Sequence, residues 1–301
     1  MWNWFCVVIL GIVEGLTEFL PVSSTGHLVL VESWLDFQNT LGDGGKAFAD
    51  AFKMIIQLGA ILAILVVYPK RFIGLADLRW RPGFAGMRGL LLLFATSVPT
   101  ALLGVAFNDV IDQWLLSPLP VTIALAVGAI WILVIERLLV RRTATKYSIS
   151  SEQSTEFVAK SETIAESARQ TGGLDQLTWK QAVGIGCFQC LALWPGMSRS
   201  TSTILGAMML GVERKTATAY SFFAAVPIMI GATLWTVLRK YDVILAGGHF
   251  GLLTVGFIVS FLAAWLAVRW FVHFLTRHTL RPFGWYRLIL AAICLAFYLM
   301  K

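Results

Sequence analysis

The sequence predicts an all-helical protein that crosses a membrane about six times and carries two further helical hairpins. Three observations lead to this prediction. Hydrophobic residues make up 57% of the 301 residues and charged residues only 14%, whereas a typical soluble domain is about 25% charged. Mean hydropathy is +0.75. Long uncharged stretches also alternate with connectors rich in Lys and Arg, as in polytopic membrane proteins.

Composition excludes an ordinary soluble globule, a disordered chain and a collagen-like rod. The net charge is +7, from 24 basic and 17 acidic residues. Because the basic residues lie between apolar runs, they indicate membrane topology and contact with membrane lipids, and we expect no nucleic-acid partner. The four cysteines lie within or beside apolar stretches and form no disulfide framework.

Six stretches are long and apolar enough to span a bilayer, which takes about 20 residues. Placing the basic connectors in the cytoplasm lets the sides of the membrane alternate, apart from Arg239 and Lys240. The expected spans are 47–68, 89–108, 119–140, 216–238, 251–274 and 284–300.

Two segments, 1–37 and 180–213, are apolar at both ends and interrupted by polar clusters at 21–27 and 195–200. For the sides to alternate, each segment must enter and leave on the same side. We therefore expect two re-entrant hairpins, one from each face. Non-helical backbone at membrane depth is tolerated only where protein buries it or a wet cavity adjoins it.

The run from Glu14 to Ser23 resembles the run from Gln189 to Ser198, which suggests an inverted repeat with a site where the two breaks meet. Residues 143–176 are polar, and we expect them to be partly helical over 154–169 or disordered. The expected organisation is one integral-membrane domain over 1–301, with a first repeat over about 1–110, a second over about 180–301 and a cytoplasmic polar loop over about 141–178.

Glu14 and Glu18, the acidic pair, are four residues apart and share one helix face. A carboxylate deep in a membrane costs roughly 2.5–3.5 kcal/mol, so such residues are functional by default. Three interpretations stay open. The pair holds a divalent cation such as Mg²⁺ or Ca²⁺; one member is protonated and acts as a general acid; or both face water at the interface.

The run Ser23-Ser24-Thr25-Gly26-His27 follows the acidic pair. It supplies three hydroxyls, a glycine that permits a tight turn and an imidazole. A hydroxyl becomes a nucleophile with the help of a base, and histidine is the usual one. A hydroxyl here can equally cap the helix that follows, and both roles can coexist.

Arg199 lies at the start of a predicted helix over 201–211. A helix N-terminus favours phosphate, and guanidinium adds bidentate hydrogen bonds to phosphate oxygens. A structural salt bridge from Arg199 to the acidic pair is the competing interpretation. Neighbouring hydroxyls that could add to a phosphate site are Ser198, Ser200 and Thr203.

The two clusters together offer acid–base groups, a nucleophile and an anion cradle, which suits hydrolysis of a phosphate anhydride on a lipid. Residues 13–27, VEGLTEFLPVSSTGH, and 187–200, CFQCLALWPGMSRS, strongly resemble undecaprenyl-diphosphate phosphatases of the BacA (bacitracin-resistance) type. The resemblance covers nearly the whole chain.

The resemblance implies a hydrolase that removes the terminal phosphate of undecaprenyl diphosphate and recycles the carrier lipid for peptidoglycan and cell-wall synthesis. It also implies a bacterial inner-membrane location, a site open to the periplasm, dependence on a divalent cation (Mg or Ca) and bacitracin resistance. Lys53 departs from the family pattern, where an acidic residue is familiar, so no role of that acid is transferred.

By motif position, the resemblance gives Glu14 and Glu18 as the acidic pair, with a tentative cation between them. It gives Ser24 as nucleophile, His27 as base and Arg199 as the phosphate-binding arginine. The supporting phosphate-binding set is Ser23, Thr25, Gly26, Ser198, Ser200 and Thr203.

Several alternatives stay open at this stage. Water can replace Ser24 as the nucleophile. Inverted repeats with broken helices also suit a transporter, so a polyprenyl-phosphate lipid flippase using the same site is the rival function. A purely structural membrane subunit is a second rival. A homodimer is compatible with the sequence.

Overall fold

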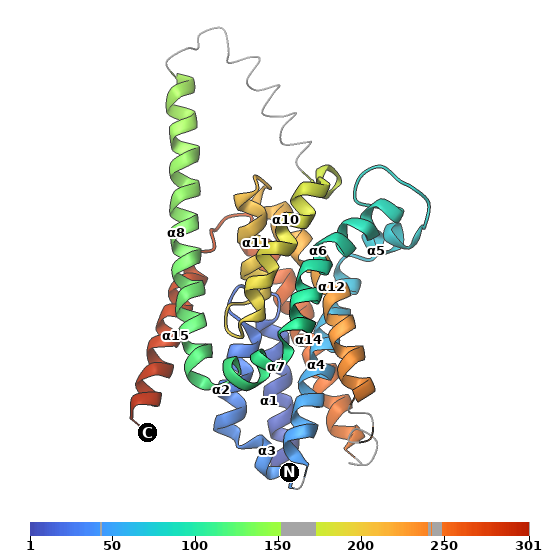
Figure 1. Cartoon of the computed structure of the whole chain (residues 1–301), viewed down its shortest axis with the longest axis vertical. Coiled ribbons are helices and arrows are strands. Elements are labelled where there is room, and N and C mark those ends of the chain that lie inside the picture. Colours follow the sequence, from blue (N-terminus) through green and yellow to red (C-terminus); the bar gives the residue numbers. More distant parts are fainter. Residues whose placement is uncertain (43, 152–172, 240–241, 243–248, 301) are drawn as a thin grey trace.

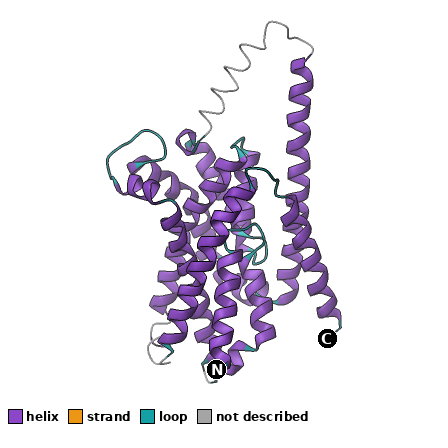
Figure 2. Cartoon of the chain, turned by 180° about the vertical axis from the view of Figure 1, so that it is seen from behind, coloured by secondary structure: helices purple, strands orange, loops and turns teal. Residues whose placement is uncertain are grey.

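The computed structural model describes residues 1–42, 44–151, 173–239, 242 and 249–300. Across these ranges every regular element is a helix, as Figure 2 shows. The longer helices run roughly along one common direction (Figure 1). The prediction of an all-helical protein is confirmed.

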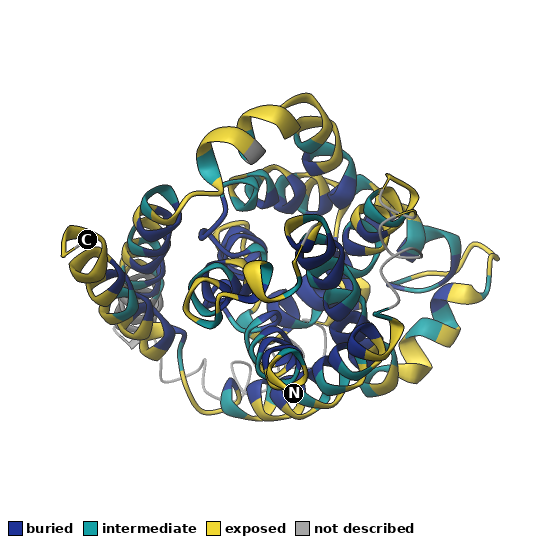
Figure 3. Ribbon diagram, turned by 90° about the horizontal axis from the view of Figure 1, so that it is seen from below, coloured by how far each residue is buried: buried dark blue, intermediate teal, exposed yellow. Residues whose placement is uncertain are grey.

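Six long apolar helices match the six expected spans, with ends that differ by a few residues. The chain is a multi-pass membrane protein: large apolar side chains such as Phe94 and Leu238 are exposed on the outside of the bundle, where exposed positions dominate in Figure 3, and apolar surface of this extent requires an apolar environment. These helices are α4 (Gly45–Val67), α6 (Gly86–Ala106), α8 (Pro118–Ser151), α12 (Arg214–Arg239), α14 (Phe250–Phe274) and α15 (Arg281–Leu299).

Helix α8 is longer than predicted. It continues to Ser151 and protrudes beyond the other helices in Figure 1, so residues 143–151 are helical rather than part of a polar loop. The stretch of α8 that is apolar enough to span a membrane ends at Leu139. The helix expected over 154–169 lies outside the described residues.

Both interrupted segments fold as two α-helices joined by a break, which in the second segment follows the short 3-10 helix η3 (Cys190–Leu193). Helices α1 (Trp2–Thr17) and α2 (Ser24–Leu35) pack against each other, and so do α10 (Trp179–Gln189) and α11 (Arg199–Met209). In Figure 1 the first pair lies toward the end with the N-terminus and the second toward the opposite end. Re-entry into the membrane from opposite faces stays a prediction.

Short helices complete the described chain. In Figure 1 the connectors that contain α5, join α11 to α12 and join α14 to α15 all lie on the side toward which α8 protrudes. They are α3 (Phe37–Thr40), α5 (Pro69–Ala76), α7 (Asn108–Val110), the π-helix η1 (Ile111–Leu115) and the 3-10 helices η2 (Leu174–Gln176) and η3 (Cys190–Leu193).

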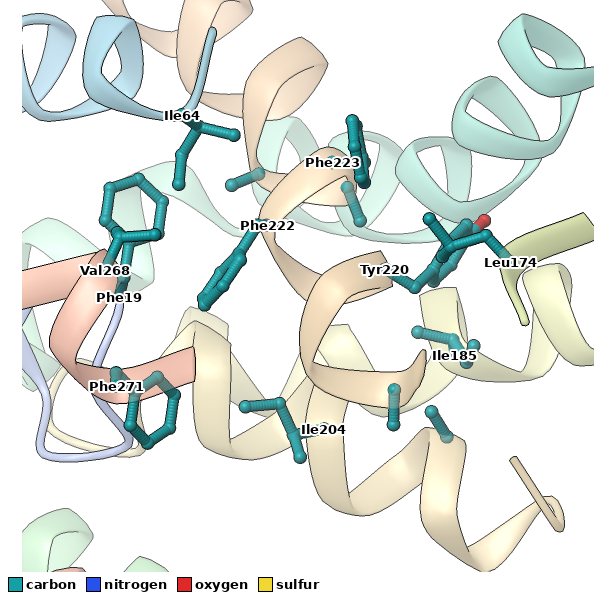
Figure 4. Packing of buried hydrophobic residues seen from close by; sticks show 14 of the residues in the cluster. Phe19, Ile64, Leu174, Ile185, Ile204, Tyr220, Phe222, Phe223, Val268 and Phe271 are labelled. Atoms are coloured by element: carbon teal, nitrogen blue, oxygen red, sulfur yellow. The ribbon is translucent and has the colours of Figure 1, made fainter. Parts of the chain in front are cut away.

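Helix α12 packs against α4, α6 and α11, while α14 packs against α1 and α4, and α15 against α8. Figure 4 shows the aromatic side chains of α12 reaching into the main core on several sides. Phe19, in the first break, is fully buried there and meets Phe222 edge to face, with centroids 5.4 Å apart. This packing fixes the first break to α12.

Candidate active site

The first break is closed by a serine in an uncommon backbone conformation. Ser23 has φ +72° and precedes α2, where its Oγ accepts a hydrogen bond from the Gly26 N–H at 3.3 Å. A positive φ at a non-glycine residue is strained and persists only where the surroundings hold it. The cap starts α2 with Ser24 in its first turn, so Ser24 has a fixed position.

The second break uses the same device. Ser198 has φ +75° and caps α11, and its Oγ accepts from the Thr201 N–H at 3.2 Å. Gly196, two residues earlier, has φ +105°, and a Cβ there would lie 2.5 Å from the Val121 carbonyl oxygen of α8. Only glycine permits this close approach. Arg199 therefore begins α11 directly beside the break.

The two breaks meet at Glu18. One carboxylate oxygen of Glu18 accepts from the Arg199 Nη2 at 3.3 Å, and the other accepts a short hydrogen bond from the Ser24 Oγ. The Ser200 Oγ also donates to the Leu20 carbonyl at 2.7 Å. The structure thus joins a hydroxyl, a carboxylate and a guanidinium from segments 181 residues apart. The predicted juxtaposition of Glu18 and Arg199 is confirmed.

A cavity of about 200 Å³ opens beside this contact. Water occupies about 30 Å³ per molecule in the liquid, so the cavity has room for several waters or for a phosphate group. Its walls are polar on the side of the two breaks and apolar toward α12, at Ile228 and Met229. Six predicted site residues line it, namely Glu18, Ser23, Ser24, Thr25, Ser198 and Arg199.

The other predicted residues lie outside the lining of the cavity. Thr203 supports Arg199 indirectly: its Oγ1 lies 2.6 Å from the Ser221 Oγ, and the Ser221 carbonyl accepts from the Arg199 Nη1 at 2.8 Å. The Gly26 N–H takes part in the cap of α2, and the Ser200 hydroxyl bonds the Leu20 carbonyl.

His27 is engaged on both ring nitrogens. Its Nδ1 lies 2.7 Å from the Ser23 carbonyl oxygen and its Nε2 2.7 Å from the Tyr286 Oη. Since a carbonyl only accepts, Nδ1 carries the proton and Nε2 accepts from the tyrosine hydroxyl. Within the described residues Ser24 donates to Glu18 rather than to His27. The ring also stacks on Tyr286, which joins α2 to α15.

Glu14 is fully buried one helical turn before Glu18. Both of its carboxylate oxygens are without a hydrogen-bond partner within the described residues. Buried carboxylate oxygens need a proton, a donor or a cation. Hard divalent cations take oxygen ligands, and Mg²⁺ commonly combines one or two carboxylates with phosphate oxygens and water. The acidic pair therefore fits such a cation, although no group of three His, Cys, Asp or Glu side chains gathers in the described ranges.

Sequence reasoning missed three polar residues of the cavity wall, Gln57, Thr100 and Gln189. The Gln189 Nε2 donates to the Thr100 Oγ1 at 3.1 Å, and its buried Oε1 is without a partner among the described residues. The internal similarity already aligned Gln189 with Glu14, and this alignment was the signal that could have identified it. Thr100 has no such signal, since it is one hydroxyl within an apolar span.

Lys53, the departure from the family pattern, takes part in a separate charge cluster. Its Nζ lies 3.1 Å from a Glu32 carboxylate oxygen and 3.0 Å from Asp50. None of these three residues lines the cavity. The departure therefore lies outside the lining of the cavity.

The fold and the cavity define a class: a multi-pass helical membrane protein whose internal polar site combines a hydroxyl, a carboxylate and a guanidinium. The chain matches the family described as bacitracin resistance protein BacA over residues 7–293 and belongs to that family.

Three similar proteins are each named undecaprenyl-diphosphatase. The protein of Maridesulfovibrio salexigens is 48% identical over 99% of this chain and 100% of its own length. That of Solidesulfovibrio magneticus is 44% identical over 97% of both chains. That of Clostridium novyi is 41% identical over 96% of this chain and 94% of its own length.

Proposed function

We propose that this chain is an undecaprenyl-diphosphatase, which removes the terminal phosphate of undecaprenyl diphosphate and returns undecaprenyl phosphate to cell-wall synthesis. Membership of the BacA family and the names of full-length relatives support this function. Bacitracin resistance is the expected consequence when the protein is abundant. The same similarity disfavours the rival flippase, which would leave the substrate unhydrolysed.

The observation that supports the proposal most directly is the contact of Ser24, Glu18 and Arg199 at one cavity. The Ser24 hydroxyl already donates to a carboxylate, so the base sits where a nucleophile needs it. The guanidinium beside them can hold phosphate oxygens and neutralise charge that develops on the transferred group.

In the first step the Ser24 Oγ attacks the terminal phosphorus, and its proton passes to Glu18. A phosphorus–oxygen bond forms to Ser24, and the bond to the bridging oxygen breaks, so undecaprenyl phosphate leaves. Arg199 holds the transferred phosphoryl group throughout. Ser221 and Phe19 hold Arg199 in place, the first by a hydrogen bond of 2.8 Å and the second by its ring, 5.8 Å from the guanidinium carbon.

In the second step the oxygen of a water bonds to the phosphorus of the phosphoserine, and the bond from phosphorus to the Ser24 Oγ breaks. The proton held by Glu18 returns to the Ser24 Oγ, and both protons of the water leave with the released phosphate. Direct attack by water is the alternative, and it needs no phosphoserine. In that route Glu18 accepts the proton of the water. His27, whose two ring nitrogens bond Ser23 and Tyr286, then acts by holding the start of α2.

A divalent cation, Mg²⁺ or Ca²⁺, is part of the proposal. Glu14 and Glu18 would hold it, and it would neutralise the negative charge of the diphosphate. The unpartnered, buried oxygens of Glu14 support this assignment.

We propose that the protein lies in the bacterial inner membrane with the cavity open to the periplasm. Basic connectors favour the cytoplasmic side, and in Figure 1 they lie toward the end where α8 protrudes. The cavity-lining residues Thr100 and Ala232 lie in the C-terminal halves of α6 and α12, away from the basic connectors that precede these helices. The cavity therefore lies toward the side opposite to those connectors. The homodimer suggested earlier stays a prediction.

The test is phosphate release from undecaprenyl diphosphate in detergent micelles, with and without a chelator. We expect release by the wild type and its loss in Ser24→Ala. Ser260→Ala is the matched control, because its buried hydroxyl donates to the Ile56 carbonyl and neither residue lines the cavity.

Trapping with labelled substrate separates the two chemical routes. A phosphoserine in the wild type that is absent from Ser24→Ala supports attack by Ser24, whereas substantial activity in Ser24→Ala supports attack by water. No release by the wild type in micelles, combined with lipid translocation in vesicles, would replace the phosphatase proposal with the transporter.

A further inference from the structure

Arg287 of α15 is fully buried and forms the densest set of side-chain hydrogen bonds in the described structure. It has no carboxylate partner within the described ranges, and its acceptors are carbonyl oxygens and one hydroxyl. They are Leu125 O for Nε at 3.3 Å, Ala124 O and Gly196 O for Nη2 at 3.2 and 2.8 Å, and Pro21 O, Met197 O and Thr201 Oγ1 for Nη1 at 3.5, 3.0 and 3.0 Å.

Three of these acceptors lie in the breaks, Pro21 in the first and Gly196 and Met197 in the second, and the others belong to α8 and α11. Pro21 lies two residues before Ser23, and Gly196 lies two residues before Ser198, so one guanidinium contacts equivalent carbonyls of the two segments. Each contact precedes a serine with positive φ. Such strain persists only where the surroundings hold it, and Arg287 is a side chain that bonds both turns.

The planar guanidinium also orients the peptide between Met197 and Ser198. In a trans peptide the carbonyl and the N–H point in opposite directions. The Met197 carbonyl points at Arg287, so the Ser198 N–H points away from it, on the side of the peptide opposite to the guanidinium. Ser198 itself lines the cavity. Arg287 thereby sets the direction of a backbone donor next to the catalytic groups.

We propose that Arg287 is the positioning residue of this site, which holds the two breaks in register so that Ser24, Glu18 and Arg199 meet in reactive geometry. The inference rests on the proposed phosphatase function. It requires no contact between Arg287 and substrate. Lysine cannot replace it, because one ammonium group cannot reproduce a planar fork with five donors.

The experiment compares Arg287→Lys and Arg287→Met with Arg214→Lys, a change at a half-buried arginine that bonds a buried carboxylate. Arg214 pairs with Glu136 at 2.7 Å, and Glu136 caps the Leu280 N–H, so this pair ties α12, α8 and α15 together away from the cavity. Full-length proteins are purified in micelles, and the kcat and KM for phosphate release are measured per folded, monodisperse molecule, together with the melting temperature.

We expect a kcat about 10- to 100-fold lower in both Arg287 variants, with a smaller change in KM, because displacement of reacting groups by about 1 Å costs about 10²-fold. Arg214→Lys should lower the melting temperature and leave kcat per folded molecule unchanged. If the Arg287 variants lose melting temperature and keep the kcat of the wild type, the residue is only structural and the inference is wrong.

A second perturbation keeps the residue Arg287 and moves its guanidinium. A Cβ on Gly128 of α8 would lie 2.1 Å from the Arg287 Nη2, so Gly128→Ala must displace the guanidinium. It should lower kcat in the wild type and add nothing in the Arg287→Met background, because the two changes act on one element. Gly231→Ala is the control, since its Cβ would meet no heavy atom within 4 Å.

The wild type and the variants test the proposed function and the positioning role of Arg287 separately. A wild type without phosphatase activity contradicts the proposed function. An active wild type with a normal kcat in Gly128→Ala and in the folded Arg287 variants contradicts only the positioning role. Poor folding of the Arg287 variants leaves Gly128→Ala to decide.

Discussion

The two breaks end in the same kind of helix cap and carry opposite charges. In each, a serine with φ near +70° caps a helix through its own side chain. The first break carries the carboxylate Glu18 and the hydroxyl Ser24, and the second carries the guanidinium Arg199. Neither break has both the anionic and the cationic half of the site. The repeated scaffold therefore supplies geometry, and the divergence of side chains between the copies supplies function.

The largest expected effect tests the acidic half. Glu18→Gln should lower kcat about 10³-fold, because it removes both the proton acceptor of Ser24 and the partner of Arg199. Glu14→Gln should lower kcat less than Glu18→Gln, since Ser24 and Arg199 bond Glu18 and not Glu14 in the described structure. Steady-state phosphate release measures both. The buried Glu136→Gln is the control, and an equal loss in all three variants would contradict the special position of Glu18.

Arg199→Lys tests the cationic half. It keeps the charge and loses the fork that bonds Glu18 and Ser221 together. We expect kcat to fall about 10²-fold, comparable to the loss of one transition-state donor. A lysine variant with wild-type kcat would show that only charge matters at this position.

The serine caps that end both breaks are expected to have a smaller effect, on stability. Ser23→Ala and Ser198→Ala should each lower the free energy of unfolding by about 1 kcal/mol, because each removes a cap. Glycine at either position should cost less than alanine, since glycine adopts positive φ without strain. Thermal unfolding in micelles measures the order. If alanine and glycine rank differently in stability at positions 23 and 198, the two serine caps are not equivalent.

The smallest expected effect lies at the bundle surface. Arg71 and Asp175 form an exposed ion pair with an N–O distance of 3.1 Å. Exposed pairs contribute about 0–1 kcal/mol. Arg71→Ala should therefore change the melting temperature little and leave kcat unchanged. A loss of kcat in Arg71→Ala as large as that in Arg199→Lys would show that the effect is not specific to the arginine of the cavity.

The spans could be predicted because length and hydropathy are local properties of the sequence. The meeting of Glu18 and Arg199 followed from side alternation and from complementary charges in the two motifs. The partner of Ser24 could not be predicted, because choosing between Glu18 and His27 depends on how the break turns. Arg287 was missed since it lies beside a basic connector, where an arginine is expected to reach the membrane surface.

The ion pair across 181 residues has a consequence for synthesis. Ribosomes add about 5–20 residues per second, so Glu18 waits roughly 10–40 s before its cationic partner exists. A carboxylate at membrane depth costs roughly 2.5–3.5 kcal/mol during that interval. The first hairpin should therefore settle into its final depth late, when the second one arrives from the translocon and docks against it.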